Sequence, residues 1–221
     1  MPFDLPPVTR NLLIANVVVF LLQMAMHDAT SLALTQHFAL WPIGPDLSGI
    51  APDGNLVTGG FRPWQLVTYA FMHGGVTHIL FNMFALWMFG GAIERTFGAR
   101  NFIIYYFVCA IVAALAQLIV VHWFTHGFYP TLGASGAIFG LLLAFGMLYP
   151  HEKLMLIFLP IPIPAWLFVT GYAVVELVMG VTGTQAGVAH FAHLGGMVGG
   201  IVLIEYWRGK FPIKPKRRLM R

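Results

Sequence analysis

Charged residues are scarce in this chain. Asp, Glu, Lys and Arg together make up only 9% of its 221 residues, whereas soluble domains carry about 25%. Hydrophobic residues make up 58%, and the mean hydropathy is +0.79. This composition excludes an ordinary soluble globular domain and indicates an integral membrane protein.

Cysteine is almost absent as well. The single Cys109 lies inside an apolar run, so an intrachain disulfide is excluded and the redox compartment cannot be deduced. The stretch from Met1 to Arg10 lacks the basic segment and the cleavage site of a signal peptide. We therefore expect the first apolar run to remain in the mature protein, as part of one membrane domain.

Long apolar stretches recur along the chain, each close to the length that crosses about 30 Å of hydrocarbon. They occupy residues 9–26, 76–92, 102–122, 135–149, 165–181 and 189–207. The sequence therefore predicts an all-α membrane protein, a bundle of six transmembrane helices. It also predicts a long first loop, residues 27–75, which is rich in Gly and Pro and contains apolar residues suited to the membrane interface.

Lys and Arg are unevenly distributed between the two sides of the predicted bundle. Arg62 lies on one side, and the other 11 of the 12 basic residues lie on the side of the termini. Since positive charge accumulates in cytoplasmic loops, we expect a cytoplasmic N-terminus at 1–8, a six-span domain at 9–207 and a basic cytoplasmic tail at 208–221. The tail is suited to anionic lipid headgroups. It lacks interleaved aromatic residues, so no nucleic-acid partner is expected.

Four polar residues fall at a similar depth within the predicted spans. At 1.5 Å per residue, Ser135 lies about 22 Å above the cytoplasmic end of its span, and His193 lies equally far above Arg208. His78 and Asn82 lie at about 24 and 18 Å on one face of the second span. Because polar residues inside a membrane face the bundle interior or a water-filled cavity, we expect these four side chains to meet.

A serine, two histidines and an asparagine supply the groups that acyl transfer requires. A serine hydroxyl is a poor nucleophile until a base takes its proton, which makes His193 the candidate base for Ser135. His78 and Asn82, with the backbone N–H of Ser135, are candidates to stabilise the oxyanion intermediate. Taken singly, Ser135 would be better explained as a helix cap and His193 as a hydrogen-bonded core histidine.

Glycines four residues apart occur on the two spans that carry the serine and the base. Gly136 and Gly140 form one GxxxG pattern, and Gly196 and Gly200 form another. The pattern lets helix backbones approach closely, as a Ser-His hydrogen bond requires, although it is also common in simple packing.

Glu176 is an acidic residue inside the fifth span. We expect it to reach water or a backbone donor near the outer end, in a structural role. No Asp or Glu in the spans is an obvious third member of a triad, so the sequence favours a Ser-His dyad. His190 and His193 have a spacing that suggests a metal pair, but no carboxylate or cysteine is placed to complete a zinc site. No metal and no cofactor are predicted.

Three segments resemble the rhomboid family of intramembrane proteases. HGGVTHILFNMFALWMFGGAIE (73–94) is similar to its second transmembrane helix, GASGAIFG (133–140) to its nucleophile motif, and AHLGGMVGG (192–200) to its histidine helix. The similarity extends over about residues 60–207, and the three motifs in this order are highly specific.

The resemblance implies an intramembrane serine endopeptidase that cuts transmembrane protein substrates. It implies Ser135 as nucleophile, His193 as base, and His78 and Asn82 as oxyanion stabilisers. Phe139 takes the place of an aromatic residue that packs on the catalytic imidazole. Gly133, Gly136, Gly196 and Gly200 belong to the matching motifs.

The short six-span form is similar to bacterial members, which implies the bacterial inner membrane. The chain departs from some of them in its first loop, where Trp41 is followed by Pro42 instead of Arg, so the position of the loop in the membrane stays open. The main alternative function is a non-catalytic protein of the same fold that binds membrane helices. The physiological substrate and the oligomeric state are not indicated by the sequence.

Overall fold

The computed structural model describes residues 5–26, 28–50, 56–156, 159–183 and 189–215. Its α-helices are α1 (Pro7–Ala25), α2 (Asp28–Phe38), α3 (Gln65–Thr68), α4 (Val76–Ala85), α5 (Gly91–Phe97), α6 (Ala99–Val120), α7 (Ser135–Leu148), α8 (Ala165–Thr182) and α9 (His190–Trp207). A 3₁₀ turn, η1 (Tyr69–Phe71), precedes α4. The π-helical turn η2 (Leu86–Gly90) joins α4 to α5, and a second, η3 (Val121–Thr125), extends α6.

Two antiparallel hairpins lie in loops that the sequence does not predict to contain strands. One pairs β1 (Leu47–Ile50) with β2 (Leu56–Gly59), and the other pairs β3 (Lys153–Leu156) with β4 (Leu159–Pro164). Three of the six β4 residues are proline, which is tolerated because a strand in a two-stranded hairpin has a free edge.

The predicted all-α membrane bundle is confirmed. Within the described residues, four helices are long and apolar enough to cross a membrane: α1, the continuous helix Val76–Phe97, α6 with η3, and α8. α7 is apolar but shorter. The long helices coincide with the predicted spans to within a few residues, whereas the number of crossings stays a prediction.

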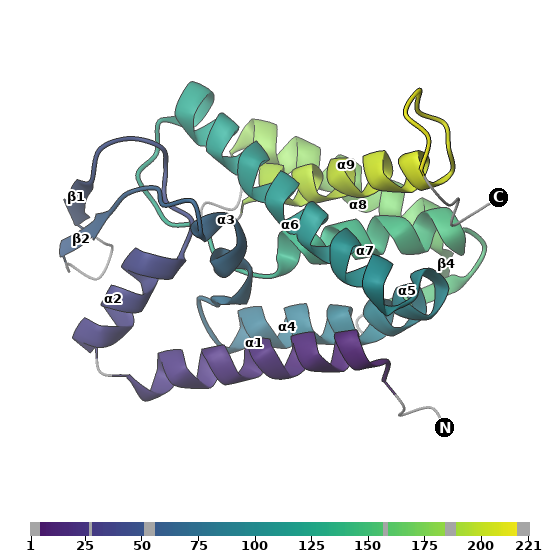
Figure 1. Cartoon of the computed structure of the whole chain (residues 1–221), viewed down its shortest axis with the longest axis horizontal. Coiled ribbons are helices and arrows are strands. Elements are labelled where there is room, and N and C mark those ends of the chain that lie inside the picture. The colour runs from purple at the N-terminus through teal and green to yellow at the C-terminus, as the bar shows by residue number, and fades with distance from the viewer. Residues whose placement is uncertain (1–4, 27, 51–55, 157–158, 184–188, 216–221) are drawn as a thin grey trace.

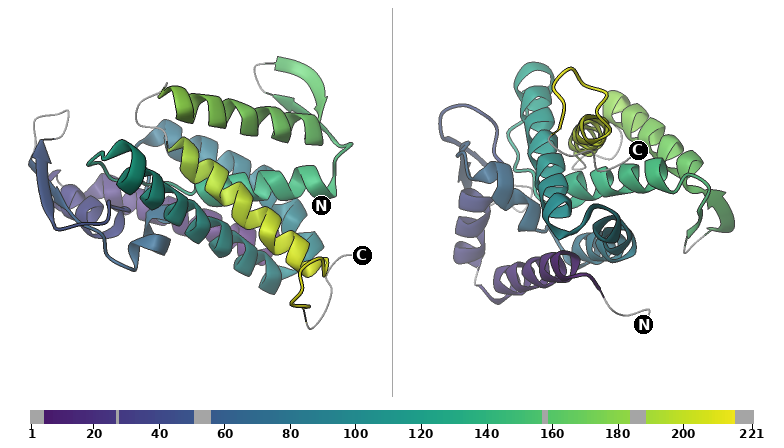
Figure 2. Two further views of the ribbon diagram at one scale, coloured as in Figure 1. Left: turned by 90° about the horizontal axis from the view of Figure 1, so that it is seen from above. Right: turned by 45° about the vertical axis from the view of Figure 1, so that its right-hand side comes forward.

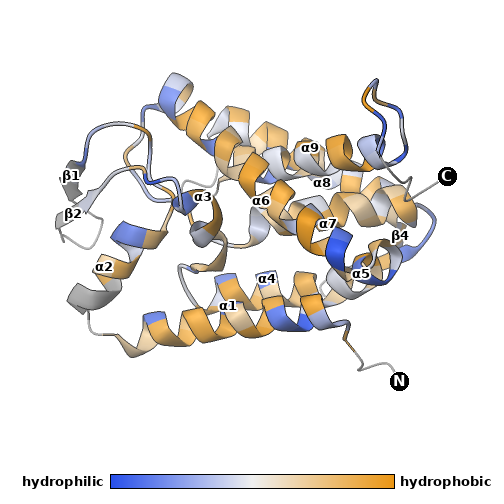
Figure 3. Ribbon diagram, in the orientation of Figure 1, coloured by the Kyte–Doolittle hydropathy of each residue, from blue (hydrophilic) through white to orange (hydrophobic). Residues whose placement is uncertain are grey.

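The helices run back and forth between two ends of the molecule. α1 begins and α9 ends at the same end, while α2, β1 and β2 lie beyond the opposite end (Figures 1 and 2). Hydrophobic residues dominate the helices along their length, and hydrophilic residues gather mainly near the ends and in loops (Figure 3). Many outward-facing side chains of α1 and α8 are exposed apolar residues such as Leu21 and Val178. This pattern suits helices surrounded by lipid.

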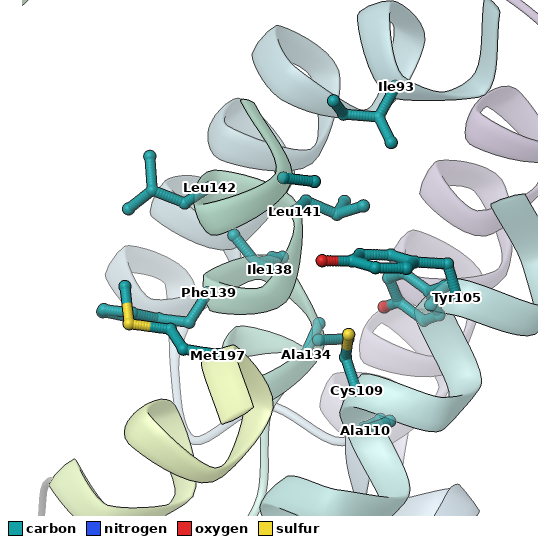
Figure 4. Close-up of a cluster of buried hydrophobic side chains, with 14 of the residues drawn as sticks. Ile93, Tyr105, Cys109, Ala110, Ala134, Ile138, Phe139, Leu141, Leu142 and Met197 are labelled. Carbon is teal, nitrogen blue, oxygen red and sulfur yellow. The ribbon is translucent and has the colours of Figure 1, made fainter. Parts of the chain in front are cut away.

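α7 lies at the centre of the core, against α6 and α9. Figure 4 shows the apolar side chains that fill this region, from α5, α6, α7 and α9, with Cys109 packed among them. The backbones of α7 and α9 are very close, because a β-carbon on Gly196 would lie only 1.9 Å from the carbonyl oxygen of Gly136. Tyr105 of α6 donates a hydrogen bond to the carbonyl of Gly140 at 2.8 Å. These contacts fix the height of α7 relative to its neighbours.

The first loop is anchored by the buried side chain of Gln65. Its Oε1 accepts hydrogen bonds from the backbone N–H groups of Trp41 and Arg62, and its Nε2 donates to the carbonyl of Gly60. Arg62 also forms a 2.8 Å ion pair with Asp46, and this hydrogen bond lowers the pKa of the Asp46 carboxyl. The described parts of the first loop are therefore joined to one another by these hydrogen bonds.

Two backbone hydrogen bonds connect the first loop to the segment before α7. Leu40 and Thr131 exchange N–H···O bonds of 2.9 and 2.8 Å. Because Thr131 lies four residues before Ser135, these bonds attach the segment that leads into α7 to the first loop.

Glu94 secures the start of α1. Its carboxylate accepts hydrogen bonds from the backbone N–H groups of Val8 and Thr9 and from the Thr9 hydroxyl, at 2.7–3.0 Å. Helix N-termini leave such N–H groups without intrahelical partners, and the helix dipole favours negative charge there. One buried carboxylate thus caps a helix from 85 residues away in sequence.

Candidate active site

Ser135 is the first residue of α7. The turn before it contains Gly133, whose φ of +119° strongly favours glycine. The N–H of Gly133 donates to the carbonyl of Tyr69 at 2.9 Å, so the turn is held against η1. The N–H groups of the first turn of α7, including that of Ser135, have no partner within the helix and are available to an anion.

His193 of α9 lies within hydrogen-bond distance of Ser135. Its Nε2 is 2.8 Å from the Ser135 Oγ. The ring stacks on Phe139 with 4.2 Å between centroids and 6° between planes. Phe139 is one turn after Ser135 on the same helix, so α7 supplies both the hydroxyl and the surface that orients the imidazole. Both residues are less than a tenth exposed.

The predicted glycines lie where α7 and α9 meet. Gly136 and Gly196 face each other, and a β-carbon on Gly140 would lie 2.4 Å from the Cys109 Sγ. On Gly200, a β-carbon would lie 2.3 Å from the Tyr105 hydroxyl oxygen. A larger side chain at any of these positions would push α7, α9 and α6 apart. Small residues therefore allow the close helix packing that brings His193 to Ser135.

His78 and Asn82 of α4 lie on the other side of Gly133. A β-carbon on Gly133 would be 2.7 Å from the His78 Nε2 and 3.6 Å from the Asn82 Nδ2. The Gly74 N–H donates to the His78 Nδ1 at 3.4 Å, which leaves Nε2 as the protonated nitrogen of the neutral ring. The buried Asn82 Nδ2 has no hydrogen-bond partner in the described part of the chain. Two N–H donors therefore converge near the N-terminus of α7.

These side chains line one open cleft of about 740 Å³. Its walls are contributed by α4, the segment 129–133, α7, α8 and α9. Phe81 of α4, which is 53% exposed, and Tyr172 of α8 line it as well. A cleft of this volume accommodates several residues of an extended peptide next to the Ser135 hydroxyl.

Glu176 of α8 contacts two histidines. Its Oε2 lies 2.9 Å from the His193 Nδ1 and 2.7 Å from the His190 Nδ1. Glu176 is only 4% exposed, so the expectation that it reaches water near the outer end is wrong. The expectation that no carboxylate is placed to complete a ligand set with His190 and His193 is wrong as well. α8 is rotated so that the carboxylate faces α9.

Comparison with known proteins identifies the family. A sequence model of the Rhomboid domain matches residues 60–209, which is more than half of the chain. The chain belongs to the rhomboid family. The matched range contains Ser135, His193, His78, Asn82 and all three motifs noted in the sequence.

Rhomboid relatives with assigned names include both mitochondrial and bacterial proteins. The chain is 34% identical over 170 residues to the mitochondrial Rhomboid protein 1 of Saccharomyces cerevisiae, covering 70% of this chain and 45% of that protein. It is 38% identical over 92 residues to the rhomboid protease GluP of Bacillus subtilis, covering 42% and 17%. It is 29% identical over 136 residues to the rhomboid protease GlpG of Klebsiella pneumoniae, covering 62% and 41%. The matches thus span less than half the length of these relatives.

Most of the residues selected from the sequence line the cleft: Ser135, His193, His78, Asn82, Phe139, Gly133 and Gly136. Gly196 and Gly200 lie instead where α9 packs on its neighbours. The structure adds two residues that were not predicted there. Glu176 contacts the imidazole of His193, and Tyr172 packs on Phe139 with 5.0 Å between ring centroids. A signal for Glu176 was present, because a carboxylate inside a membrane needs a polar partner at its own depth.

Proposed function

We propose that this rhomboid is an intramembrane serine endopeptidase that hydrolyses peptide bonds in or near transmembrane segments of other membrane proteins. The observation that carries the proposal is the 2.8 Å contact between the Ser135 Oγ and the His193 Nε2 in a cleft inside a membrane bundle. It is supported by relatives that are named rhomboid proteases.

In the first half of the reaction, His193 Nε2 takes the Ser135 hydroxyl proton while Oγ forms a bond to the carbonyl carbon of the substrate. The π electrons of the C=O bond move to its oxygen, which becomes an oxyanion. His78 and Asn82 donate hydrogen bonds to this oxyanion, together with the Ser135 N–H. When the C–N bond breaks, the proton on His193 passes to the leaving amine, and an acyl-enzyme remains.

Water completes the reaction. His193 takes a proton from the water molecule as the water oxygen attacks the ester carbon, and a second oxyanion forms in the same place. The bond to Oγ then breaks and the proton returns to Ser135. The peptide bond has been exchanged for one amine and one carboxylic acid, and no cofactor is consumed.

The substrate must present an extended peptide bond. A helical peptide bond is shielded by its own hydrogen bonds and side chains, so we expect cleavage near Gly, Ala or Pro residues where a transmembrane helix unwinds. We propose that such a segment reaches the cleft between α4 and α8, which line it through Phe81 and Tyr172. Engineered cross-links between α4 and α8 should then reduce cleavage of a transmembrane substrate while leaving a small serine-directed probe reactive. Unchanged cleavage would place substrate access elsewhere.

The topology and location belong to the same proposal. We propose that both termini lie in the cytoplasm, because 11 of the 12 Lys and Arg residues fall on their side of the predicted bundle. The cleft would then lie toward the opposite side and the basic tail near anionic lipid. The bacterial inner membrane stays a prediction, because the relatives include mitochondrial proteins.

Cleavage of a fluorescent transmembrane substrate by purified protein in detergent tests the function. The proposal predicts product from wild type and only background from Ser135→Ala and His193→Ala. If wild type fails on several substrates and Ser135 does not react with a serine-directed probe, the chain is instead a non-catalytic protein that binds membrane helices.

A further inference from the structure

Glu176 lies behind the imidazole of His193, on the side away from Ser135. His193 Nδ1 is 2.9 Å from the Glu176 Oε2, and His193 Nε2 is 2.8 Å from the Ser135 Oγ. A hydroxyl, an imidazole and a carboxylate from α7, α9 and α8 therefore form one continuous chain of hydrogen bonds. The side chains of Glu176 and His193 are 5% and 11% exposed, so solvent competes little for these contacts.

We propose that Glu176 is a positioning residue for His193, so that the site works as a Ser135–His193–Glu176 triad in place of a dyad. The proposal rests on the serine protease function proposed above. Glu176 does not touch the substrate or the reacting bond. It acts through the imidazole, by fixing which nitrogen carries the proton and by stabilising the charged ring.

The contact with Glu176 determines the tautomer of His193. An ionised carboxylate only accepts hydrogen bonds, so the proton in the contact with Glu176 must lie on Nδ1. In a neutral imidazole the other nitrogen, Nε2, then has a free lone pair. That lone pair faces the Ser135 hydroxyl, which is the arrangement in which His193 can take the proton. Without an acceptor at Nδ1, the ring could equally carry its proton on Nε2 and could not act as a base.

Glu176 also supplies a negative charge next to the His193 ring. When His193 takes the Ser135 proton, it becomes an imidazolium inside a buried site, where an unpaired charge is costly. The Glu176 carboxylate is in hydrogen-bond contact with this ring and offsets its positive charge. The other titratable groups around His193 are His78 from α4, Tyr172 from α8 and His190 from α9, and none of these carries a negative charge at neutral pH.

His190 holds the carboxylate in place. It lies one helical turn before His193 on α9, and its Nδ1 is 2.7 Å from the same Glu176 Oε2. Two N–H donors on one face of α9 thus hold a single oxygen from α8. This arrangement gives His190 a role without contact to substrate, and it connects α8, which lines the cleft, directly to the base.

A metal ion is the other occupant that this donor set could take, because the three ligand atoms lie within 4.8 Å of one another. The contact lengths favour hydrogen bonds over a shared metal ion. Two ligands on one tetrahedral zinc ion lie about 3.3 Å apart, whereas the separations from Oε2 are 2.7 and 2.9 Å. A metal on Nδ1 would also place the ring proton on Nε2 and remove the base. Cleavage by the proposed triad should therefore resist chelators.

The central test compares Glu176→Gln and Glu176→Ala with wild type. Glutamine keeps an oxygen that accepts the His193 N–H but removes the charge, whereas alanine removes both. The measurements are kcat and KM on the fluorescent transmembrane substrate, the pH dependence of kcat/KM, and the labelling rate of Ser135 by a fluorophosphonate. Glu152→Gln is the matched control, because this exposed carboxylate lies at the opposite end of α7.

We expect Glu176→Gln to lower kcat about 10²-fold, with KM within about twofold of wild type and a parallel loss of labelling rate. The acid limb of its pH profile should move to lower pH, because the charged ring has lost its partner. Glu176→Ala should be slower still, Glu176→Asp should recover part of the rate, and Glu152→Gln should match wild type. A chelator should leave the wild-type rate unchanged.

Several outcomes would overturn the proposal. One is a Glu176→Gln enzyme with kcat within about twofold of the Glu152→Gln control. Another is a loss confined to KM or thermal stability, with an unchanged pH profile, which would mean a structural role only. Loss of activity with a chelator would assign the cluster to a metal. If instead Ser135→Ala cleaves as well as wild type, Ser135 is not the nucleophile and the proposed serine protease function itself fails, whatever Glu176→Gln does.

Discussion

The α-carbon of Gly133 faces the imidazole of His78 so closely that a β-carbon there would lie 2.7 Å from Nε2. The space that glycine leaves open is bordered by the two side-chain N–H donors from α4 and by the N-terminus of α7. An oxyanion formed by attack of Ser135 would occupy this region. In the proposed mechanism, glycine at this position thus serves both the turn with positive φ and the oxyanion site.

Gly133→Ala should therefore abolish most of the activity. The methyl group would fill the space next to the His78 Nε2, and φ of +119° is strained for alanine. Cleavage rate and thermal stability should be measured together, since both are expected to fall. Gly171→Ala on α8 is the matched control, because a β-carbon there meets nothing within 4 Å. Equal activity of the two variants would place the oxyanion elsewhere.

Asn82→Ala should lower kcat by about 10²- to 10³-fold with a much smaller change in KM, as expected for the loss of one oxyanion donor. The Asn82 Nδ2 is buried and unpaired in the described structure, so its removal costs little in the resting protein. Steady-state kinetics on the transmembrane substrate measure the changes in kcat and KM separately. Phe84→Ala, an exposed side chain on the same helix, should retain activity. A rise in KM alone would reassign Asn82 to substrate binding.

Gly196→Ala should separate the two helices that hold the serine and the base. The added methyl group would meet the Gly136 carbonyl at 1.9 Å, and backbone cannot yield as a flexible side chain does. Overpacking of this kind typically costs about 1–3 kcal/mol, so the thermal midpoint and the cleavage rate should both decrease. Val198→Ala, two residues further along α9 at an exposed position, provides the comparison. A fully active and stable Gly196→Ala would show that α7 and α9 tolerate a wider separation.

Glu94→Ala should weaken the attachment of α1 while leaving the chemistry intact. It leaves the N–H groups of Val8 and Thr9 without their acceptor, and unpaired buried donors cost about 1–3 kcal/mol each. We expect a lower thermal midpoint with kcat close to wild type for the protein that remains folded. Unchanged stability would mean that water replaces the carboxylate.

The contact of Ser135 with His193, and the position of His78 and Asn82 in the same cleft, agree with the depths calculated from the sequence. A helix rises by a fixed distance per residue, so residues counted from the same membrane surface have comparable depths. Depth does not determine rotation about the helix axis. The contact of Glu176 with His193 depends on how α8 is turned against α9, and that is fixed by packing between residues far apart in sequence.

The loops were less predictable for a related reason. In the sequence, Gln65 is an ordinary polar residue before the second span. In the structure, its amide is surrounded by backbone groups from three parts of the first loop. Likewise, three of the six residues of β4 are proline, a residue that is depleted in strands, yet β4 pairs with β3. Hydrogen bonds of this kind join loop segments whose sequences share no hydrophobic repeat. No pattern in the sequence therefore predicts them.

The central claim is that His193 activates Ser135 as a nucleophile. Mass spectrometry of the protein after reaction with a fluorophosphonate tests it most directly, because no substrate has to be known. The account predicts one adduct on wild type, located on the peptide that contains Ser135, no adduct on Ser135→Ala, and strongly slowed labelling of His193→Ala. Labelling of Ser135 at the wild-type rate in His193→Ala, or an adduct on another residue in wild type, would contradict it.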